Sequence, residues 1–348
     1  MLSRITISPK WLRAIFVLFC TFLGVVTLLR LPTSSPAGNL KFDLSVLSGK
    51  QVNWSRFAYT QYATDRDYLC NSVMMFETLN RLGSKADRLL MYSSEWSIDD
   101  NHETYESNLL RYARDHYAVK LKPIEVQVRD GSEETWSKSY TKLLAFNQTE
   151  YDRVLNVDSD ATIMKIMDEL FLLPSSPVAM PLAYWRESDK QIFTSALILV
   201  QPSAADFNRT MDAISHADGN TFDMEIMNNL YRNSTLVIPH RPYILLTGEF
   251  RSSNHSAYLG SAHEKWNPEK ALLEAKYLHF SDWPVPKPWI KPMPGVIDES
   301  QPACEFNPAT GQNDNCRAQK IWSAVYDDYN TRRENICKTA DREGGPPQ

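Results

Sequence analysis

The chain has 348 residues, of which 43% are hydrophobic and 11% aromatic, enough apolar material for a sizeable core in one large domain or two. This composition excludes a disordered chain. The formal net charge is -5 and the pI is near 5.9, so the totals predict no basic face for nucleic acid, and no nucleic-acid partner is expected.

An apolar stretch near the N-terminus predicts a membrane anchor. Arg4, Lys10 and Arg13 precede the stretch, and no small-residue cleavage pattern follows it. The positive charge before the stretch keeps the N-terminus cytosolic and sends the rest of the chain into the lumen. A cleaved signal peptide is the alternative. The predicted parts are a cytosolic tail at 1–13, a signal-anchor transmembrane helix at 14–31, a stem at 32–50 and a lumenal domain at 51–348.

Five sequons for N-glycosylation agree with a lumenal domain. They begin at Asn53, Asn147, Asn208, Asn233 and Asn254. We therefore expect a glycoprotein of the secretory pathway.

Four cysteines lie outside the apolar stretch, enough for two disulfides. If residues 315–336 form one helix, Cys316 and Cys337 are roughly 30 Å apart by the helical rise per residue, beyond the reach of a disulfide. The pairs Cys304–Cys316 and Cys70–Cys337 are therefore predicted. Buried free thiols are the alternative.

Strand-like and helix-like segments alternate after the stem, which predicts an α/β layered fold. The predicted strands are 56–62, 88–92, 124–128, 152–157, 195–200 and 276–280. The predicted helices are 65–83, 101–118, 136–146, 203–216, 223–231 and 315–336. Right-handed crossovers make the early strands parallel, and such sheets bind ligands outside the carboxyl ends of their strands.

Two aspartates, Asp158 and Asp160, follow the strand 152–157 at such an end. Residues i and i+2 of an extended segment face the same side, so both carboxylates can bind one hard cation, Mg²⁺ or Mn²⁺. A cation there can neutralise the charge of a departing diphosphate, as nucleotide-sugar transferases require. Taken alone, the pattern also suits a turn or a helix cap.

The segments from about Arg56 to Trp289 together resemble, in order, glycosyltransferase family eight, which contains glycogenin. The resemblance is strongest to its fungal Golgi branch, which includes N-acetylglucosaminyltransferases acting on mannose chains. It implies a GT-A fold, a Rossmann-like and mainly parallel sheet flanked by helices. It also implies a UDP-sugar donor.

The resemblance assigns a metal site and two lysines. A histidine in a later His-Phe segment completes the family metal site, and here it is His279, beside Asp158 and Asp160. Imidazole next to two carboxylates favours Mn²⁺, with Mg²⁺ as the alternative. Lys142 matches a lysine that reaches the donor, and Lys287 matches the lysine on the diphosphate, where it stabilises the leaving group.

The resemblance also assigns contacts to the nucleotide and to the sugar. Nucleotide contacts correspond to Ala58, Tyr59, Thr60 and Tyr68, in the first strand and the helix after it. Ser195 corresponds to a sugar contact. Each of these residues, taken singly, is also compatible with a purely structural role.

One further polar residue, Asp223, matches the family helix that lies by the reacting carbon of the sugar. It is our candidate for positioning the acceptor or for a nucleophile-like role, and a helix cap is the alternative. Met224 replaces the glutamine that usually follows in the family. Ser281, Asp282 and Trp283 stand where the family commonly has a glycine after the His-Phe pair.

These residues together predict a retaining glycosyltransferase, a single-pass type II protein of the Golgi membrane with its catalytic domain in the lumen. Asp223 and Lys287 are the predicted catalytic residues. The donor sugar is N-acetylglucosamine by resemblance, and the acceptor is a glycan such as terminal mannose of N-glycans or mannan. Same-face attack and a transient adduct both remain open. The alternatives are UDP-glucose or UDP-galactose as donor, hydrolysis of the nucleotide sugar, and a catalytically silent glycan-binding or scaffolding protein.

Overall fold

The computed structural model describes residues 51–99, 101–128, 138–186, 191–218 and 221–343. The chain divides into two compact units, residues 1–48 and 49–348. The predicted tail, signal anchor and stem lie outside the described residues. None of the described helices is both long enough and apolar enough to cross a bilayer.

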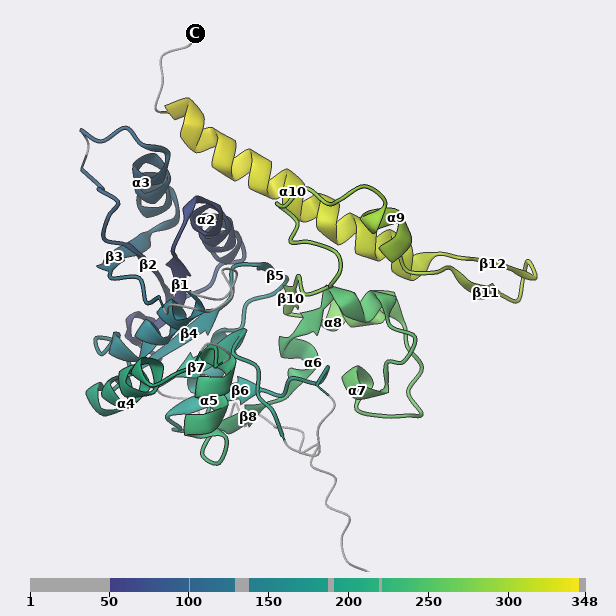
Figure 1. Cartoon of the computed structure of the whole chain (residues 1–348), viewed down its shortest axis with the longest axis horizontal. Helices are drawn as coiled ribbons and strands as arrows, with labels where there is room; N and C mark the ends of the chain where they lie inside the picture. Colours follow the sequence, from purple (N-terminus) through teal and green to yellow (C-terminus); the bar gives the residue numbers. More distant parts are fainter. Residues whose placement is uncertain (1–50, 100, 129–137, 187–190, 219–220, 344–348) are drawn as a thin grey trace, which may run out of the picture. The chain divides into compact units, whose positions relative to one another are not determined.

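A seven-stranded sheet in the order β3-β2-β1-β4-β7-β6-β8 forms the centre of the second unit (Figure 1). Six of these strands run in one direction, and β7 is antiparallel to both its neighbours. The mainly parallel sheet predicted from the sequence is therefore confirmed. The strands are β1 (Phe57–Ala63), β2 (Asp87–Ser93), β3 (Val119–Ile124), β4 (Arg153–Val157), β6 (Val178–Pro181), β7 (Leu197–Val200) and β8 (Leu236–Ile238).

A smaller sheet in the order β5-β10-β9 and a two-stranded hairpin complete the strands of the described residues. These strands are β5 (Ala161–Ile163), β9 (Leu245–Leu246), β10 (Tyr277–His279), β11 (Glu305–Asn307) and β12 (Gln312–Asn315). The α-helices are α2 (Arg66–Arg81), α3 (Tyr105–Tyr117), α4 (Ala204–Ser215), α5 (Asp223–Tyr231), α6 (His240–Tyr243), α7 (Ser256–Leu259), α8 (Pro268–Glu274), α9 (Val296–Ser300) and α10 (Arg317–Glu343). The 3-10 helices are η2 (Trp54–Arg56), η3 (Ser139–Asn147), η4 (Asp168–Leu172) and η5 (Thr247–Arg251).

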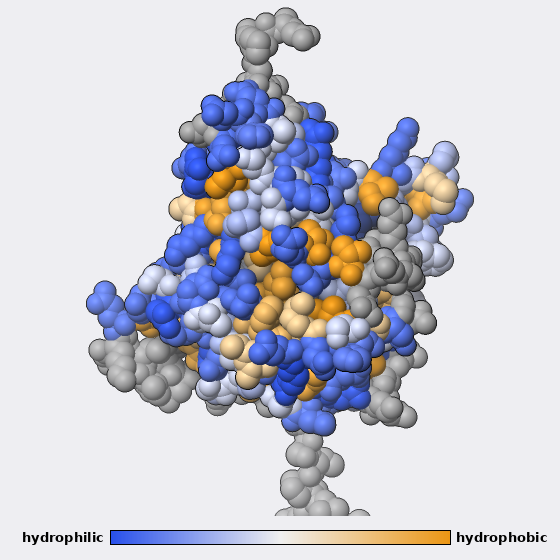
Figure 2. All heavy atoms as spheres, turned by 60° about the vertical axis from the view of Figure 1, so that its left-hand side comes forward, coloured by the Kyte–Doolittle hydropathy of each residue, from blue (hydrophilic) through white to orange (hydrophobic). Residues whose placement is uncertain are grey.

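Helices cover both faces of the large sheet because its strands are apolar on both faces, as buried parallel strands are. In β4, Leu155 packs into the cluster that contains residues of α2, α3 and α10, and Val154 packs into the cluster with residues of η3, α4 and α5. Successive side chains of a strand point to opposite faces, so each strand contributes to both clusters. On the face drawn in Figure 2, hydrophobic side chains gather in the middle and hydrophilic ones surround them.

One predicted strand is wrong. The third strand is β3, Val119–Ile124, and not 124–128. The preceding helix ends at Tyr117, and Ala118 adopts a left-handed backbone (φ 51°) that turns the chain. Val119 therefore already pairs with Arg88 of β2. The helix predicted at 136–146 falls partly outside the described residues. Its described part is the 3-10 helix η3.

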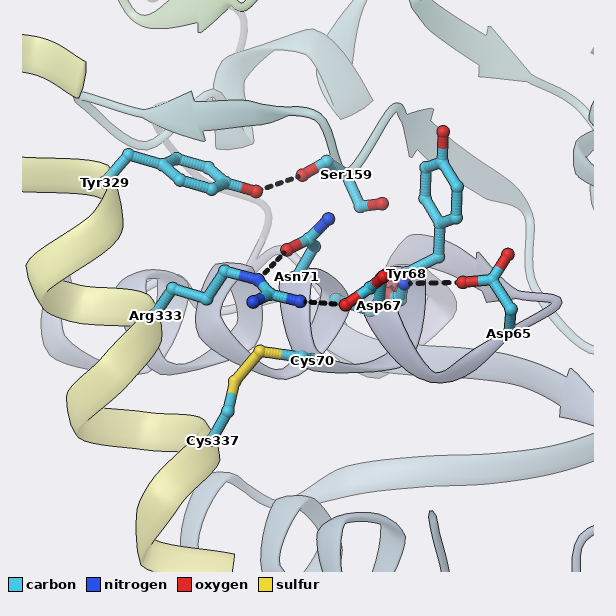
Figure 3. The surroundings of a disulfide bond; sticks show 10 residues. Asp65, Asp67, Tyr68, Cys70, Asn71, Ser159, Tyr329, Arg333 and Cys337 are labelled. Atoms are coloured by element: carbon cyan, nitrogen blue, oxygen red, sulfur yellow. Dashed lines mark hydrogen bonds and ion pairs between the residues drawn. A yellow bond between two sulfur atoms is a disulfide. The ribbon is translucent and has the colours of Figure 1, made fainter. Parts of the chain in front are cut away.

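The long C-terminal helix α10 lies against α2 and α3 (Figure 1). Both predicted disulfides are present: Cys70 of α2 is joined to Cys337 of α10, and Cys304 to Cys316. Figure 3 shows that Arg333, one turn before Cys337, also reaches α2, where its guanidinium donates to Asn71 at 3.0 Å and pairs with Asp67 at 2.5 Å. A covalent bond and an ion pair thus fix this helix to the first βα unit.

Removal of the Cys70–Cys337 disulfide is expected to destabilise the protein more than removal of Cys304–Cys316. The two bonds close loops with sequence separations of 267 and 12 residues. A longer loop leaves more conformational entropy to the unfolded chain, so the two losses should differ by roughly 2–3 kcal/mol. The measurement is urea-induced unfolding of the two double alanine variants. Equal midpoints for the two variants would contradict the expectation.

Candidate functional site

The site begins in the turn that links β4 to β5, where Asp158, Ser159 and Asp160 follow the last strand residue, Val157. The large sheet holds the start of this turn, because the Asp158 amide donates to the Ala196 carbonyl just before β7, at 3.0 Å. The turn thus lies at the carboxyl end of a central strand, where the sequence analysis expected a ligand to bind.

The small sheet brings a histidine to the same turn. β10 is antiparallel to β5, with His279 opposite Ala161, and the Phe280 amide donates to the Asp160 carbonyl at 2.9 Å. This register places the His279 imidazole beside the Asp160 carboxylate. Two segments more than a hundred residues apart in sequence therefore meet at one point.

Two buried tyrosines fix the backbone of the turn by hydrogen bonds to its carbonyl groups. The Tyr277 hydroxyl lies 3.0 Å from the Asp158 carbonyl and 3.1 Å from the Ala196 carbonyl. The Tyr329 hydroxyl of α10 donates to the Ser159 carbonyl at 3.2 Å (Figure 3). Both tyrosine side chains are fully buried. The two carboxylates are thus presented on a backbone whose carbonyls are already satisfied.

The side chains of Asp158, Asp160 and His279 form a cluster that suits a metal ion. Their ligand atoms lie within 4.8 Å of one another. Nε2 of His279 is 3.1 Å from Asp160 Oδ1 and 3.9 Å from Asp158 Oδ2. No described residue hydrogen-bonds Nδ1 of this ring. Two carboxylate oxygens and one imidazole nitrogen are a donor set that fits a divalent cation such as Mn²⁺.

Two lysines contact the cluster, one at each aspartate. Lys142 of η3 is buried, 4% exposed, and its Nζ lies 2.7 Å from Asp158 Oδ1 and 2.9 Å from Asp223 Oδ2. Lys287 follows β10, and its Nζ lies 2.6 Å from Asp160 Oδ2. Three carboxylates and two ammonium groups leave one net negative charge. A divalent cation reverses that sign, which suits the charge of a diphosphate.

The pKa values of these groups follow from burial and from the neighbouring charges. Burial raises the pKa of Asp158, with a further contribution from Asp160 that Lys142 opposes. Burial acts in the same sense on Asp160, but Lys287 and His279 outweigh it and hold its pKa well below the ordinary value. Burial would lower the pKa of Lys142, but Asp158 and Asp223 raise it well above the ordinary value. Lys142 is therefore a fixed positive charge inside the protein.

Asp223 is the first residue of α5 and shares Lys142 with Asp158. Burial opposes its ionisation, but Lys142 and the Ser195 hydroxyl outweigh burial and lower its pKa. The dipole of α5 acts in the same direction, because a carboxylate at a helix N-terminus is favourable. Asp223 is thus an ionised carboxylate beside the cluster, and Ser195 lies against it. The structure brings both predicted residues to the site.

The nucleotide contacts assigned to Ala58, Tyr59 and Thr60 need correction. All three have no exposed surface, and they lie inside β1. The Tyr59 hydroxyl donates to Asp168 at 3.0 Å within the core, and Thr60 Oγ1 accepts from Asn156 Nδ2 at 3.1 Å. Their side chains are therefore committed to packing and do not reach the cluster.

Tyr68 lies in the first turn of α2, which Asp65 caps by accepting from the Tyr68 amide at 3.0 Å. Burial raises the pKa of Tyr68, and the charge of the nearby Asp160 raises it further. The ring packs edge-on against Trp289, with centroids 5.7 Å apart. Tyr68 therefore lies close enough to Asp160 to sense its charge, and its contact with the nucleotide stays a prediction.

Three aromatic residues near the cluster escaped the sequence analysis. The residue of β1 that approaches the cluster is Tyr62, whose ring centroid lies 6.0 Å from Lys142 Nζ. Tyr277 and Tyr329 support the turn by the bonds described above. The position of Tyr62 one strand residue from Ala63, where β1 ends, was a signal that it lies nearer the ligand edge than Tyr59. Nothing in the sequence marks Tyr277 or Tyr329 as partners of the turn.

Comparison with known proteins identifies close relatives and a shared fold. The chain is 50% identical over 298 residues to glucose N-acetyltransferase 1 of Gibberella zeae, a match that covers 84% of this chain and 65% of that protein. It is 43% identical over 350 residues to glucose N-acetyltransferase 1 of Aspergillus fumigatus, covering 96% of this chain and 89% of that protein. No protein-family model matches the chain.

Among solved structures, the bifunctional glycosyltransferase WbbM in its apo form is similar, with a TM-score of 0.50 and 14% identity. The match covers 69% of this chain and 48% of that one. At this identity the likeness shows the fold alone. The α/β fold with its mainly parallel sheet is thus a glycosyltransferase fold, consistent with the GT-A class.

Replacement of Lys142 by methionine is expected to lower the free energy of unfolding by about 3–5 kcal/mol, because it leaves two buried carboxylates without their cation. Lys122 is the matched control, since its pair with Glu150 is about one-third to one-half exposed. Lys122→Met should change stability by about 1 kcal/mol or less. Chemical denaturation without added metal measures both. Equal effects of the two substitutions would refute the role given to Lys142.

Proposed function

Because the chain belongs to the glucose N-acetyltransferase 1 family, we propose that it transfers N-acetylglucosamine from a UDP-sugar to a glycan acceptor. The observation that carries the proposal is the cluster of Asp158, Asp160 and His279 with a lysine on either side, at the carboxyl end of β4. The donor set and the two lysines fit a cation and a diphosphate better than they fit a plain sugar-binding site.

Within this proposal Asp158, Asp160 and His279 hold Mn²⁺, with Mg²⁺ as the alternative. The bound cation supplies Lewis-acid neutralisation of the diphosphate. Lys287 contacts Asp160, one of the proposed metal ligands, and its side chain is partly exposed. Its positive charge would therefore lie next to the diphosphate and stabilise the departing UDP. Lys142 is buried between Asp158 and Asp223, where its charge favours the ionised form of both carboxylates and holds them in place.

Asp223 is the proposed catalytic carboxylate on the acceptor side. It is ionised, it lies on the far side of Lys142 from Asp158, and Ser195 lies against it. A carboxylate there can accept a hydrogen bond from an acceptor hydroxyl that attacks on the face from which UDP leaves. Alternatively, it can itself bond to the reacting carbon as UDP leaves, and the acceptor hydroxyl then displaces it. Both routes retain the anomeric configuration, and only the second forms a transient adduct.

The donor sugar follows from the relatives' printed name, which joins glucose and an N-acetyl group. N-acetylglucosamine combines the two. Acetyl transfer to glucose would also fit these words, but it has no need of a metal cluster flanked by lysines. UDP-glucose and UDP-galactose would use the same diphosphate site and remain alternative donors. Terminal mannose of an N-glycan or of mannan is the proposed acceptor.

We further propose a single-pass type II protein of the Golgi membrane, anchored through residues 14–31, with the domain from residue 51 in the lumen. The charge distribution around the apolar stretch supports this orientation. The asparagines of all five sequons are exposed on the folded domain, where a glycosyltransferase of the secretory pathway would reach them.

The transfer proposal predicts slow release of UDP from one donor in a panel of UDP-sugars, dependent on Mn²⁺ and lost with a chelator. Asp160→Asn should reduce the rate by roughly 100-fold or more, since substitutions one shell farther out already cost 10–100-fold at metal sites. The exposed Asp298→Asn is the control and should release UDP at the wild-type rate. Transfer to mannose-terminated acceptors, with the product anomer assigned by NMR, tests retention. Absence of UDP release from every donor would refute the proposal.

The topology proposal predicts that the full-length chain from secretory membranes moves faster on a gel after endoglycosidase treatment. Replacing all five sequon asparagines by glutamine should abolish the shift. Carbonate extraction should leave the full-length chain in the membrane pellet, whereas the chain from residue 51 onward, secreted behind a cleavable signal, should be soluble. An unchanged mobility of the wild-type chain would contradict a lumenal domain.

A further inference from the structure

One exposed aromatic side chain stands beside the site without a role in the mechanism above. Trp283 is 91% exposed. An indole is among the largest apolar side chains and is highly buried on average, so its nearly complete exposure here is informative. Trp283 lies in the loop between His279 and Lys287, two residues that both contact Asp160.

Both ends of the loop that carries Trp283 are held at the Asp160 carboxylate. His279 and Lys287 lie 3.1 Å and 2.6 Å from the two oxygens of Asp160, and Lys287 Nζ also donates to the Phe280 carbonyl at 2.6 Å. Trp283 is four residues from each end of this loop, so its Cα lies within about 14 Å of both ends. One or two sugar rings bridge such a distance.

A buried carboxylate holds the loop in this shape. The Asp282 side chain is 1% exposed, and it accepts from Trp322 Nε1 at 2.6 Å, Arg251 Nη1 at 2.5 Å and Tyr326 OH at 3.3 Å. Its carbonyl accepts from the Val285 amide at 2.7 Å. The residue before Trp283 is thus anchored to η5 and α10. The exposed position of the indole is therefore built into the fold and does not result from a loose loop.

The exposed apolar side chains of the loop and of the segment after it favour a ligand with an apolar face, and the absence of acidic residues from 283–294 leaves nothing there to repel an electron-rich hydroxylated one. Residues 283–294 contain two lysines and no acidic residue, and Ile290 and Met293 are 50% and 74% exposed. A pyranose ring presents an apolar C–H face that stacks on an aromatic ring, while its hydroxyls stay in water. A glycan acceptor is longer than the single sugar that is transferred, so its remaining units would meet the surface beside the cluster.

We propose that Trp283 is a stacking platform for the glycan acceptor, on which a sugar unit near the reacting end rests while the diphosphate site holds the donor. This inference rests on the proposed transfer function. It assigns acceptor recognition to the three residues, Ser281 to Trp283, that replace a glycine after the His-Phe pair. Trp283 touches the acceptor, and Asp282 is a positioning residue that acts through the loop.

The test is direct binding of mannotriose, maltotriose and chitotriose to the lumenal chain by calorimetry, with UDP and Mn²⁺ present. Trp283→Ala should weaken binding of the preferred oligosaccharide roughly tenfold or more, as expected for an anchor residue of a binding site. Trp283→Tyr should remain within about threefold of wild type, because it keeps an aromatic face. Phe306→Ala is the matched control, since Phe306 is 61% exposed on the β11–β12 hairpin. It should bind as the wild type does.

The outcomes separate this inference from the function it rests on. Equal binding by wild type and Trp283→Ala, or no binding of any tested glycan by the wild type, would overturn the platform, whatever UDP release shows. Loss of glycan binding in Trp283→Ala supports the platform even if no donor releases UDP, a result that would remove the transfer function alone. If Trp283→Ala instead loses retention on vesicles of phosphatidylcholine and phosphatidylserine while glycan binding is unchanged, the loop is a membrane contact and the platform is refuted.

Discussion

The repulsion between three carboxylates, one buried and two largely buried, is the constraint on which the rest of the site depends. Asp158, Asp160 and Asp223 are all largely withdrawn from water, where like charges a few ångströms apart interact strongly. Lys142 and Lys287 offset this repulsion with their positive charges. Lys142 is the more important of the two because two carboxylates share it. The remaining negative charge favours the binding of a divalent cation at this place.

Neutralising their charge does not by itself fix the positions of the carboxylates. The hydrogen-bonded backbone of the turn fixes them. The carbonyls of Asp158 and Ser159 accept hydrogen bonds from Tyr277 and Tyr329, residues that come from β10 and α10. Because α10 is itself tied to α2 by the Cys70–Cys337 disulfide, the position of the turn depends on contacts across nearly the whole second unit. This explains why a C-terminal helix with no predicted functional residue lies directly behind the metal cluster.

The sequence revealed the parts of this arrangement that have a local signature. The i, i+2 spacing marked Asp158 and Asp160, and the resemblance supplied His279 and Lys142, all of which the structure brings together. The nucleotide contacts in β1 were assigned to residues too near the start of the strand. Alternating side chains along a buried strand look alike in the sequence, and only the end of the strand identifies the edge where a ligand binds.

The third strand was misplaced for a related reason. Val126 and Val128 alternate with polar residues in the sequence, as a half-buried strand does. The pairing partner of β2 is decided by where α3 stops, however, and the left-handed backbone of Ala118 is not visible in the residue type. Tyrosine partners of the turn were equally invisible, since long-range hydrogen bonds leave no periodicity in the chain.

The loop from His279 to Lys287 shows how one short segment can connect two recognition tasks. Its ends, His279 and Lys287, contact the same carboxylate of Asp160, so a shift of the loop would move the proposed metal ligand and the proposed diphosphate lysine together. Asp282 prevents such a shift. Its buried carboxylate accepts hydrogen bonds from three donors, and no other position would keep all three bonds. A glycine at this place would leave the loop without that anchor. The segment 281–283 therefore supplies both rigidity and an exposed indole. In the proposed function, the residues that constrain the donor site also present a surface to the acceptor.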